Sequence, residues 1–392
     1  MLASGPSHAH RRAPSRLYAW AAGAVAAVLG FGLVYANTIV NQVDGAFTPV
    51  DNSDLVSDVP RGEGSPDPAD LNDDGAINIL LMGSDARDGE NGDIGGHVAD
   101  GMRNDTTIVM HISADRSRAD LVSIPRDAQV EIPTCKYFDG SSIPATSGDF
   151  NRSFSNGGRH GDPAEAAACV INTVQKMSGL TIDHWAVVDF SGFEDMIDAI
   201  GGVPMCIPER IVSKKARLDL EAGPQVLTGK EALGLARMRT AEVGDVSGSD
   251  LQRIARQHEL LRQVSRVVLS KNLLTDAGEL TQFLKAVASA LTMDPELADS
   301  RYLIGLAFSL RNIAPAAIQF HTIPWEYTED RLNVVILDSA DTMWTQMRKD
   351  EPLTKVGDDS AGDTWDDVID KSPEPVPTST DVTESLLEEC TA

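Results

Sequence analysis

The residues of this chain best suited to chemistry are four arginines that lie, with no lysine among them, between Arg237 and Arg256. They stand out because the chain has a formal net charge of −26, from 59 acidic and 33 basic residues, and so repels anions over most of its surface. A planar guanidinium binds phosphate through two parallel hydrogen bonds, which a lysine ammonium cannot do. A run of charge is most often a solvated helix face. The position of these side chains decides whether they form such a face or a phosphate-binding site.

The second half of this arginine-rich segment has the pattern of a helix that begins at Asp250, a favourable N-cap residue, and ends near Lys271. Arg253 and Gln257 lie on one stripe of this helix. The stripe continues with apolar residues at the same spacing, namely Leu261, Val264 and Val268. The apolar part must face the core, so Arg253 and Gln257 point inward as well. An inward guanidinium is costly unless it meets an anion, and we therefore expect a pocket that binds one.

Charged residues also mark the ends of three short runs that are rich in β-formers. The runs span residues 77–82, 105–112 and 119–124. If they form antiparallel neighbours, as short connections favour, then Asp85, Asp105 and Arg126 reach the same edge of the sheet. Arg103 lies at that edge too. Two carboxylates beside arginines suit one divalent cation and one phosphate, whereas an aspartate alone at a strand end is commonly turn punctuation.

The remaining pattern predicts an α/β fold in a single domain over residues 76–350, with a central mixed, largely antiparallel β-sheet between helices. Helices are expected at 164–176, 193–200 and 228–237, with one or two mostly core helices at 273–310. Further strands are expected at 185–190, 203–207, 319–324 and 334–337.

An uncharged stretch at 17–40 is long enough to cross a bilayer, which takes about 20 residues. Arg11, Arg12 and Arg16 precede it, and the next basic residue is Arg61. The positive-inside rule then predicts a single-pass protein of the cell membrane, with a cytoplasmic N-terminus and an extracellular catalytic domain. A cleaved secretory signal is the competing interpretation.

Polar segments flank the predicted domain. Both are rich in Asp, Pro, Ser, Thr and Gly and poor in aromatic residues, which is typical of flexible chain. The organisation expected is a cytoplasmic tail at 1–16, the membrane helix at 17–40, an extracellular linker at 41–75 and an acidic flexible C-terminal tail at 351–392.

Four cysteines, namely Cys135, Cys169, Cys206 and Cys390, fit an oxidising exterior and allow two disulfides. Spacing alone does not choose among the three pairings. We expect Cys169–Cys206, which would join neighbouring elements, and Cys135–Cys390, because a cysteine near the end of a polar tail needs a partner in the domain. A free or intermolecular Cys390 is the alternative.

Several function classes find no support in the sequence. The histidines show no metal-ligand spacing, no Gly-x-Ser-x-Gly elbow is present, and the Gly/Ser loop at 244–249 lacks a P-loop lysine. The acidic balance and the predicted external location argue against nucleic acid as a partner.

Seven short motifs occur in a fixed order between about Ile77 and Ser270. They are Gly83-Ser84-Asp85-Ala86-Arg87, Arg103-Asn104-Asp105-Thr106, Val122-Ser123-Ile124-Pro125-Arg126-Asp127, Asp189-Phe190-Ser191-Gly192-Phe193, Asp198-Ala199-Ile200-Gly201-Gly202-Val203, Leu235-Ala236-Arg237-Met238-Arg239 and Asp250-Leu251-Gln252-Arg253-Ile254-Ala255-Arg256-Gln257. Together they resemble the LytR-CpsA-Psr family of bacterial cell-wall enzymes. The ordered set is highly specific, although no single motif would be.

The resemblance implies a membrane-anchored phosphotransferase that moves a glycopolymer from an undecaprenyl-pyrophosphate carrier to peptidoglycan or another cell-envelope acceptor. The implied enzyme forms a phosphodiester with the assistance of Mg²⁺, for which Mn²⁺ can substitute. Carried over by position, Asp85 and Asp105 hold the metal. The residues implied to grip and orient the pyrophosphate are Arg126, Arg237, Arg239 and Arg253, with Gln257 assisting, Asp250 orienting the arginines and Arg103 at the same edge.

One departure concerns the carrier's head group. Many relatives carry a lysine just before the stretch Asn151-Arg152-Ser153-Phe154, where this chain has Asp149-Phe150; Arg152 or Arg159 is the expected substitute. Two other functions stay open, namely a non-catalytic scaffold that binds the polyprenyl phosphate and a lipid pyrophosphatase that uses water as acceptor.

Overall fold

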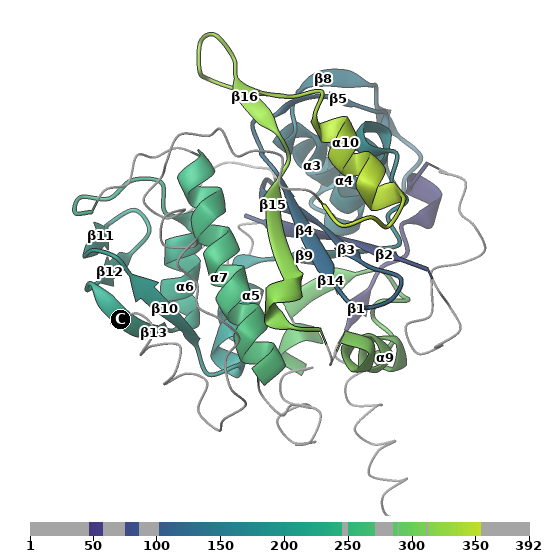
Figure 1. Ribbon diagram of the computed structural model, residues 1–392. Helices are drawn as coiled ribbons and strands as arrows, with labels where there is room; N and C mark the ends of the chain where they lie inside the picture. The colour runs from purple at the N-terminus through teal and green to yellow at the C-terminus, as the bar shows by residue number, and fades with distance from the viewer. Residues whose placement is uncertain are drawn as a thin grey trace, which may run out of the picture.

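A seven-stranded β-sheet forms the centre of the molecule (Figure 1). The computed structural model describes residues 47–57, 75–85, 102–244, 250–270, 285–288, 290–310 and 313–353. Across the sheet the strands are β1 (Thr48–Pro49), β14 (Leu291–Met293), β9 (His184–Val188), β2 (Ile77–Ser84), β3 (Asn104–Ile112), β4 (Ala119–Ile124) and β15 (Ile318–Thr322). The three strands predicted first, β2, β3 and β4, are adjacent and antiparallel, as expected.

The sheet is mixed, but antiparallel pairs do not dominate it. The pairs β2–β3, β3–β4 and β14–β9 are antiparallel, and the pairs β2–β9, β4–β15 and β1–β14 are parallel. The prediction of a largely antiparallel sheet is therefore wrong in its proportions. The reason is that β9 and β15 return to the sheet only after segments that contain helices, and connections of that length allow a strand to lie parallel to its neighbour.

Helices cover both faces of the sheet, because its strands alternate apolar side chains between two cores. Leu80 and Met82 of β2 belong to the core beneath α4 and α10, whereas Ile77 and Ile79 belong to the core beneath α9. The helices are α3 (Asn151–Gly157), α4 (Pro163–Ser178), α5 (Phe190–Ala199), α6 (Gly229–Arg237), α7 (Asp250–Ser270), α9 (Ser300–Leu310) and α10 (Ala340–Arg348).

A third core joins α5, α6 and α7 to a small β-layer beside the main sheet. In that layer β10 (Val203–Ile207) pairs with β13 (Gly223–Leu227), and β11 (Ile211–Ser213) pairs with β12 (Leu218–Leu220). Thr228 and Glu231 form a capping box that fixes the start of α6. The remaining two-stranded pairs are β5 (Gln129–Ile132) with β8 (Thr146–Asp149), β6 (Cys135–Lys136) with β7 (Ser142–Ile143), and β16 (Trp325–Tyr327) with β17 (Val334–Ile336).

Two segments differ from the sequence prediction. The expected linker at 41–75 contains β1 and a short 3₁₀ helix (Ser53–Leu55), and its Phe47 and Leu55 are buried. The folded domain therefore begins before residue 76. Inside the region predicted as helix at 273–310, β14 forms an inner strand of the sheet. Both strands are two or three residues long, which is too short to give a periodic signal.

The predicted membrane helix at 17–40 and the tail beyond residue 353 lie outside the described residues. None of the helices in the described ranges combines the length and the apolar composition that a bilayer crossing needs.

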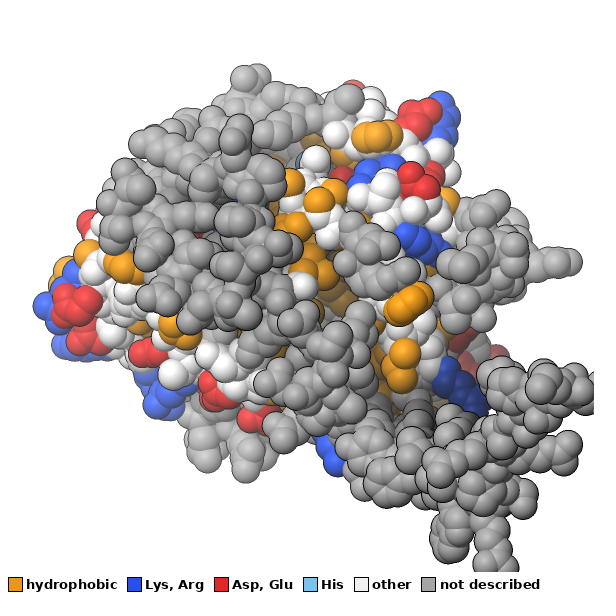
Figure 2. Space-filling model, turned by 60° about the horizontal axis from the view of Figure 1, so that its bottom comes forward, with side chains coloured by type: hydrophobic (Ala, Val, Ile, Leu, Met, Phe, Trp, Pro, Cys, Tyr) orange, Lys and Arg blue, Asp and Glu red, His pale blue; other side chains and the backbone are white. Residues whose placement is uncertain are grey.

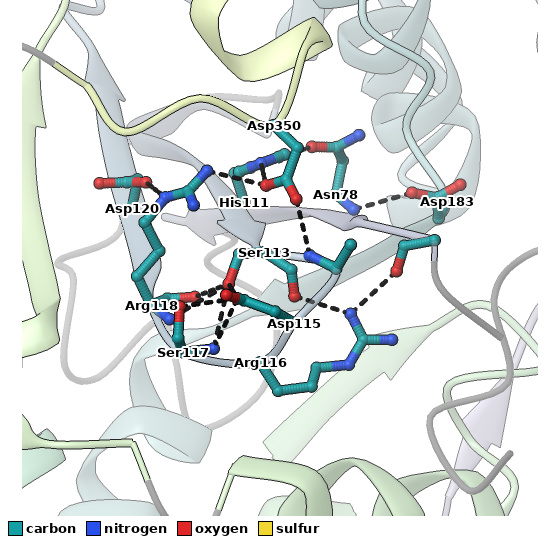
Figure 3. Close-up of polar contacts among 12 residues, drawn as sticks. Asn78, His111, Ser113, Asp115, Arg116, Ser117, Arg118, Asp120, Asp183 and Asp350 are labelled. Atoms are coloured by element: carbon teal, nitrogen blue, oxygen red, sulfur yellow. Dashed lines mark hydrogen bonds and ion pairs between the residues drawn. The ribbon is translucent and has the colours of Figure 1, made fainter. Parts of the chain in front are cut away.

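A buried polar network ties the segment after α10 to the sheet (Figure 3). His111 Nε2 lies 3.0 Å from Asp350 Oδ1, and His111 Nδ1 lies 2.7 Å from Asn78 Oδ1. Arg118 donates to Asp350 at 2.7 Å and to Asp120 at 3.1 Å. Burial lowers the pKa of His111, although Asp350 acts in the opposite direction. This histidine is therefore structural, as the absence of ligand spacing in the sequence predicts.

The structure contains a disulfide between Cys135 of β6 and Cys169 of α4, whose Cα atoms are 5.0 Å apart. Both predicted pairs, Cys169–Cys206 and Cys135–Cys390, are therefore wrong. The reason is that β5 and β6 fold back against α4, where Ile132 packs on both sulfur-bearing side chains. Cys206 instead lies in β10 of the small β-layer, far from α4 (Figure 1).

Removal of this disulfide should destabilise the domain. Its cysteines are 34 residues apart, and closing a loop of that size in the unfolded chain corresponds to about 4 kcal/mol in the chain-entropy treatment. We expect the double substitution Cys135→Ala/Cys169→Ala to lower the free energy of unfolding by about this amount in urea titrations. A loss below about 1 kcal/mol, or non-reducing peptide maps without a Cys135–Cys169 peptide, would contradict the pairing.

Candidate active site

Asp105 stands at the centre of a cluster of arginines at the edge of the sheet. Arg126 Nη1 donates to Asp105 Oδ1 at 2.6 Å, and Arg239 Nη2 lies 3.3 Å from the same oxygen. Arg253 Nη2 donates to the main-chain oxygen of Asp105 at 3.0 Å, and its Nη1 lies 3.9 Å from Oδ1. Guanidinium groups from three separate elements thus meet one carboxylate, at the edge that the sequence predicts.

The fold explains this convergence. Because β3 and β4 are antiparallel, the start of β3 and the end of β4 share an edge, which places Asp105 beside Arg126. Arg239 follows the last residue of α6 by two positions, and Arg253 lies in the first turn of α7. Arg253 is 1% exposed and Gln257 is 9% exposed, so both side chains point inward as predicted. The apolar part of the predicted stripe, Leu261, Val264 and Val268, is half-buried.

Helix α7 also holds the segment that carries Arg239. Arg256, a fully buried residue, donates through Nη2 to the main-chain oxygen of Met238. Gln257 Nε2 donates to the main-chain oxygen of Ala236 at 3.1 Å. The role of Arg256 was not predicted, although its spacing of three from Arg253 places both side chains on neighbouring positions of the helix surface.

The charge balance at Asp105 favours an anion at this place. Burial alone would raise the pKa of the Asp105 carboxyl, but the charges of Arg253, Arg126 and Arg239 outweigh this effect, and the pKa is lowered. The carboxylate is therefore charged at neutral pH. Arg126 Nε also lies 3.3 Å from Asp127. Three guanidinium groups against these two carboxylates leave an excess of one positive charge in an otherwise acidic protein.

An open pocket adjoins the cluster, with about 180 Å³ of empty space counted out to the solvent. The pocket is therefore a shallow, solvent-open depression beside the cluster and not an enclosed cavity. Its lining consists of Asp105, Thr106, Thr107, Ser123, Ile124, Arg126, Arg253, Ile254 and Gln257.

The hydroxyl-bearing residues of this lining were not predicted. Ser123 Oγ lies 2.7 Å from His258 Nε2. Burial lowers the pKa of His258 to about 3, helped by the charges of Arg262 and His321, so the ring is neutral. Thr107 follows Asp105 by two residues, and the period-two alternation of a strand was the signal that could have indicated it.

Two predicted arginines lie beside the cluster rather than within it. The Arg237 guanidinium stacks over the Phe190 ring, 3.9 Å from its centroid. Arg103 is exposed at the same edge, and its main-chain N–H donates to Asp85 Oδ1 at 2.8 Å. Asp85 is itself 7% exposed. This bond is the kind of turn contact that an aspartate at a strand end makes.

Other predicted positions are only partly described. Asp250 is the first residue of α7, but its side chain lies outside the described part of the chain. In the corner without the family's lysine, Gln129 donates to Asp149, and Arg152 and Arg159 are exposed. The described pocket lining includes neither of these two arginines.

Asp85 and Asp105 are the two carboxylates that the sequence predicts to hold magnesium. No cluster of three or more His, Cys, Asp or Glu residues suited to a metal ion occurs within the described ranges, so a dedicated protein cage is not found there. Mg²⁺ usually takes one or two carboxylates and completes its shell with water and substrate phosphates. Asp105 lines the pocket, whereas Asp85 is outside its described lining and accepts the Arg103 N–H.

The protein is an α/β domain with an arginine cluster at one edge of its sheet. The sequence profile of the LytR_cpsA_psr family matches residues 46–350. The chain therefore belongs to this family, and the predicted resemblance is confirmed.

Individual relatives carry names from cell-wall assembly. The chain is 30% identical over 268 residues to the cell wall biosynthesis protein LcpA of Corynebacterium glutamicum, a match that covers 64% of this chain and 50% of that protein. It is 28% identical over 288 residues to the polyisoprenyl-teichoic acid–peptidoglycan teichoic acid transferase TagU of Oceanobacillus iheyensis, covering 73% and 76%. The chain thus spans about half the length of the first of these relatives.

Solved structures agree on the fold. Protein gbs0355 of Streptococcus agalactiae superimposes with a TM-score of 0.55 at 18% identity, over 71% of this chain and 90% of that one. At such an identity the likeness concerns the fold alone.

Proposed function

We propose that this protein is a phosphotransferase that moves a glycopolymer from an undecaprenyl-pyrophosphate carrier to peptidoglycan or another cell-envelope acceptor. Family membership and the names of the relatives support the reaction class and the type of polymer. The observation that carries the proposal is the convergence of Arg126, Arg239 and Arg253 beside an open pocket.

The arginines supply positive charge where the reaction needs it. An acceptor hydroxyl attacks the glycopolymer phosphorus, the bridging P–O bond of the pyrophosphate breaks, and undecaprenyl phosphate leaves. Negative charge builds up on the leaving phosphate, and preorganised guanidinium donors stabilise this charge more in the transition state than in the ground state. Burial of Arg253 and its bond to the main chain of Asp105 keep its guanidinium in place before the substrate arrives.

Magnesium assistance is part of the proposal, with manganese as a substitute. Asp85 and Asp105 would hold the ion, which neutralises charge on the transferring phosphate oxygens. Thr106, Thr107 and Ser123 line the same pocket and offer hydroxyl donors to an anion.

The proposed location is the outer side of the cell membrane, anchored by the apolar segment at 17–40. A carrier with an isoprenoid tail needs an apolar surface close to the head-group pocket. Figure 2 shows hydrophobic side chains exposed on the lower face of the molecule. Ile304 and Phe308 of α9 are 37% and 53% exposed. Helix α9 packs on Ile112 and Ala119, at the opposite strand ends from Arg126, so these two side chains do not border the head-group pocket.

The test is turnover by the purified protein of a lipid-linked pyrophosphate glycopolymer, with peptidoglycan glycan strands as acceptor. We expect release of polyprenyl phosphate together with a phosphodiester-linked product. Release of polyprenyl phosphate without that product, with water as the acceptor, identifies a lipid pyrophosphatase instead. Native mass spectra that show bound polyprenyl phosphate, without turnover under any metal condition, identify a non-catalytic scaffold.

A further inference from the structure

The hairpin of β16 and β17 projects beyond the end of β15, at the top of Figure 1. The pairs Trp325–Ile336, Glu326–Val335 and Tyr327–Val334 form its ladder. Its loop is held in one shape by hydrogen bonds within it. The Thr328 N–H donates to the Asn333 main-chain oxygen at 3.0 Å, and the Arg331 N–H donates to the Thr328 main-chain oxygen at 2.8 Å. An ordered loop of this kind can present side chains to a ligand at little further entropic cost.

The hairpin exposes an aromatic surface. Tyr327 is 40% exposed and Leu332 is 76% exposed. The Tyr327 ring meets that of Trp325 edge to face, with the centroids 5.0 Å apart; Trp325 is half-buried and packs against the core, so Tyr327 is the exposed ring of the pair. The Arg331 guanidinium lies 5.6 Å from the centre of the Tyr327 ring. Tryptophan, tyrosine and arginine are the residues that most often dominate the energy of binding surfaces, and a cluster of exposed apolar side chains indicates an interaction site.

The root of the hairpin is bonded to the edge that carries Arg126. The Val334 N–H donates to the main-chain oxygen of Asp127 at 3.2 Å, and Val334 forms a bridge with Ala128. The Ile323 N–H donates to the main-chain oxygen of Ser123, a residue of the pocket lining, at 3.0 Å. The root of the hairpin is therefore fixed by its main chain to the strand end that carries Arg126.

Charge and position decide what this surface binds. Glu326, Glu329 and Asp330 are exposed on the hairpin against one exposed cation, Arg331, so the hairpin repels polyanionic chains and anionic lipid. The hairpin also follows β15, which is the edge strand opposite β1. Seven strands at the usual spacing separate these edges by about 29 Å. The hairpin therefore lies at the opposite edge of the sheet from β1.

We propose that the β16–β17 hairpin is a glycan-binding platform that holds the acceptor sugar chain beside Arg126. The C–H face of a pyranose ring packs on the face of an aromatic ring, because the ring face is electron-rich and the sugar hydrogens carry partial positive charge. Uncharged N-acetylated sugars fit a platform whose net charge is negative, whereas a phosphate-bearing donor polymer does not. This inference rests on the proposed function, since it names the acceptor of that reaction.

The experiment measures glycan binding without any donor substrate. Full-length protein in detergent is titrated with chitohexaose, a neutral oligomer of N-acetylglucosamine, by isothermal calorimetry, and with anionic phospholipid vesicles by co-sedimentation. We expect chitohexaose binding, and we expect Tyr327→Ala to raise the dissociation constant by about tenfold through loss of the ring contact. The matched control is Val335→Ala, because Val335 is 41% exposed on the opposite face of the same hairpin; its dissociation constant should equal that of the wild type.

Three results would overturn the proposal: no chitohexaose binding by the wild type, equal binding by Tyr327→Ala, or vesicle binding that Tyr327→Ala abolishes. Thermal melts of both variants, expected to match the wild type, verify that the hairpin change leaves the domain folded. The binding assay contains no donor substrate, so its result does not depend on turnover. Absence of glycan binding would overturn the platform without contradicting the proposed phosphotransferase, and a protein without turnover can still bind the glycan.

Discussion

Replacing Arg126 with alanine should abolish glycopolymer transfer while the domain stays folded. Its guanidinium is 2.6 Å from Asp105 and lines the pocket, so it reaches the place where the leaving phosphate gains charge. Removal of one preorganised donor of this kind typically lowers kcat by about 10²–10³-fold. Alanine keeps the main-chain oxygen of residue 126, which accepts the Asn151 N–H at 2.9 Å and so supports the start of α3. Transfer rates and melting temperatures of the purified proteins measure the two effects separately.

Arg239→Ala and Arg237→Ala should also remove transfer. Arg239 makes a direct contact with Asp105, whereas Arg237 stacks on Phe190, so we expect the larger loss for Arg239. Arg253 is less useful as a test, because a side chain that is 1% exposed cannot be shortened without also disturbing the core.

The matched control is Arg210→Ala. Arg210 is half exposed, and its ion pairs are to Asp219 and Glu221. This variant removes one positive charge from the small β-layer, so its transfer rate should equal that of the wild type. Wild-type rates for Arg126→Ala and Arg239→Ala together would show that the cluster is a structural charge network and not a phosphate site.

The sequence predicts the active edge well because local rules determine it. The short connection between Ile112 and Ala119 makes β3 and β4 antiparallel neighbours, and this alone brings Asp105 and Arg126 together. The helical period alone turns Arg253 inward. In both cases the information lies within a few residues of the side chain concerned.

What the sequence does not predict depends on contacts between distant segments. β14 has three residues, and its strand state exists only because β9 lies beside it. Cys135 pairs with Cys169 because β6 packs on α4, an arrangement that no local pattern contains. Gln257 illustrates both kinds of information. Its inward direction follows from the local helical period, whereas its hydrogen bond to Ala236 depends on a distant segment, because α6 must end beside α7.

Replacing Asp105 with asparagine should weaken the dependence of transfer on magnesium. The neutral amide is a poorer ligand for a hard divalent cation than a carboxylate, and it also removes the negative charge that balances Arg126, Arg239 and Arg253. We expect the Mg²⁺ concentration for half-maximal activity to rise at least roughly tenfold, as for other substitutions that disturb a metal site. Activity measured across a magnesium titration, and repeated with manganese, gives this value directly.

The comparison with Asp85→Asn and Asp219→Asn makes the magnesium result specific. Asp219 is 63% exposed in the small β-layer, so the same chemical change there should leave the titration curve unmoved. Asp85 accepts the Arg103 N–H, and an asparagine oxygen can keep that bond; a shifted curve for Asp85→Asn therefore reports lost metal affinity and not a broken turn. If Asp85→Asn keeps the wild-type curve while Asp105→Asn does not, Asp85 only stabilises its turn, and Asp105 is the one of the two carboxylates that binds the metal. If neither variant shifts the curve, the metal is held without these two carboxylates, and the magnesium assignment is wrong.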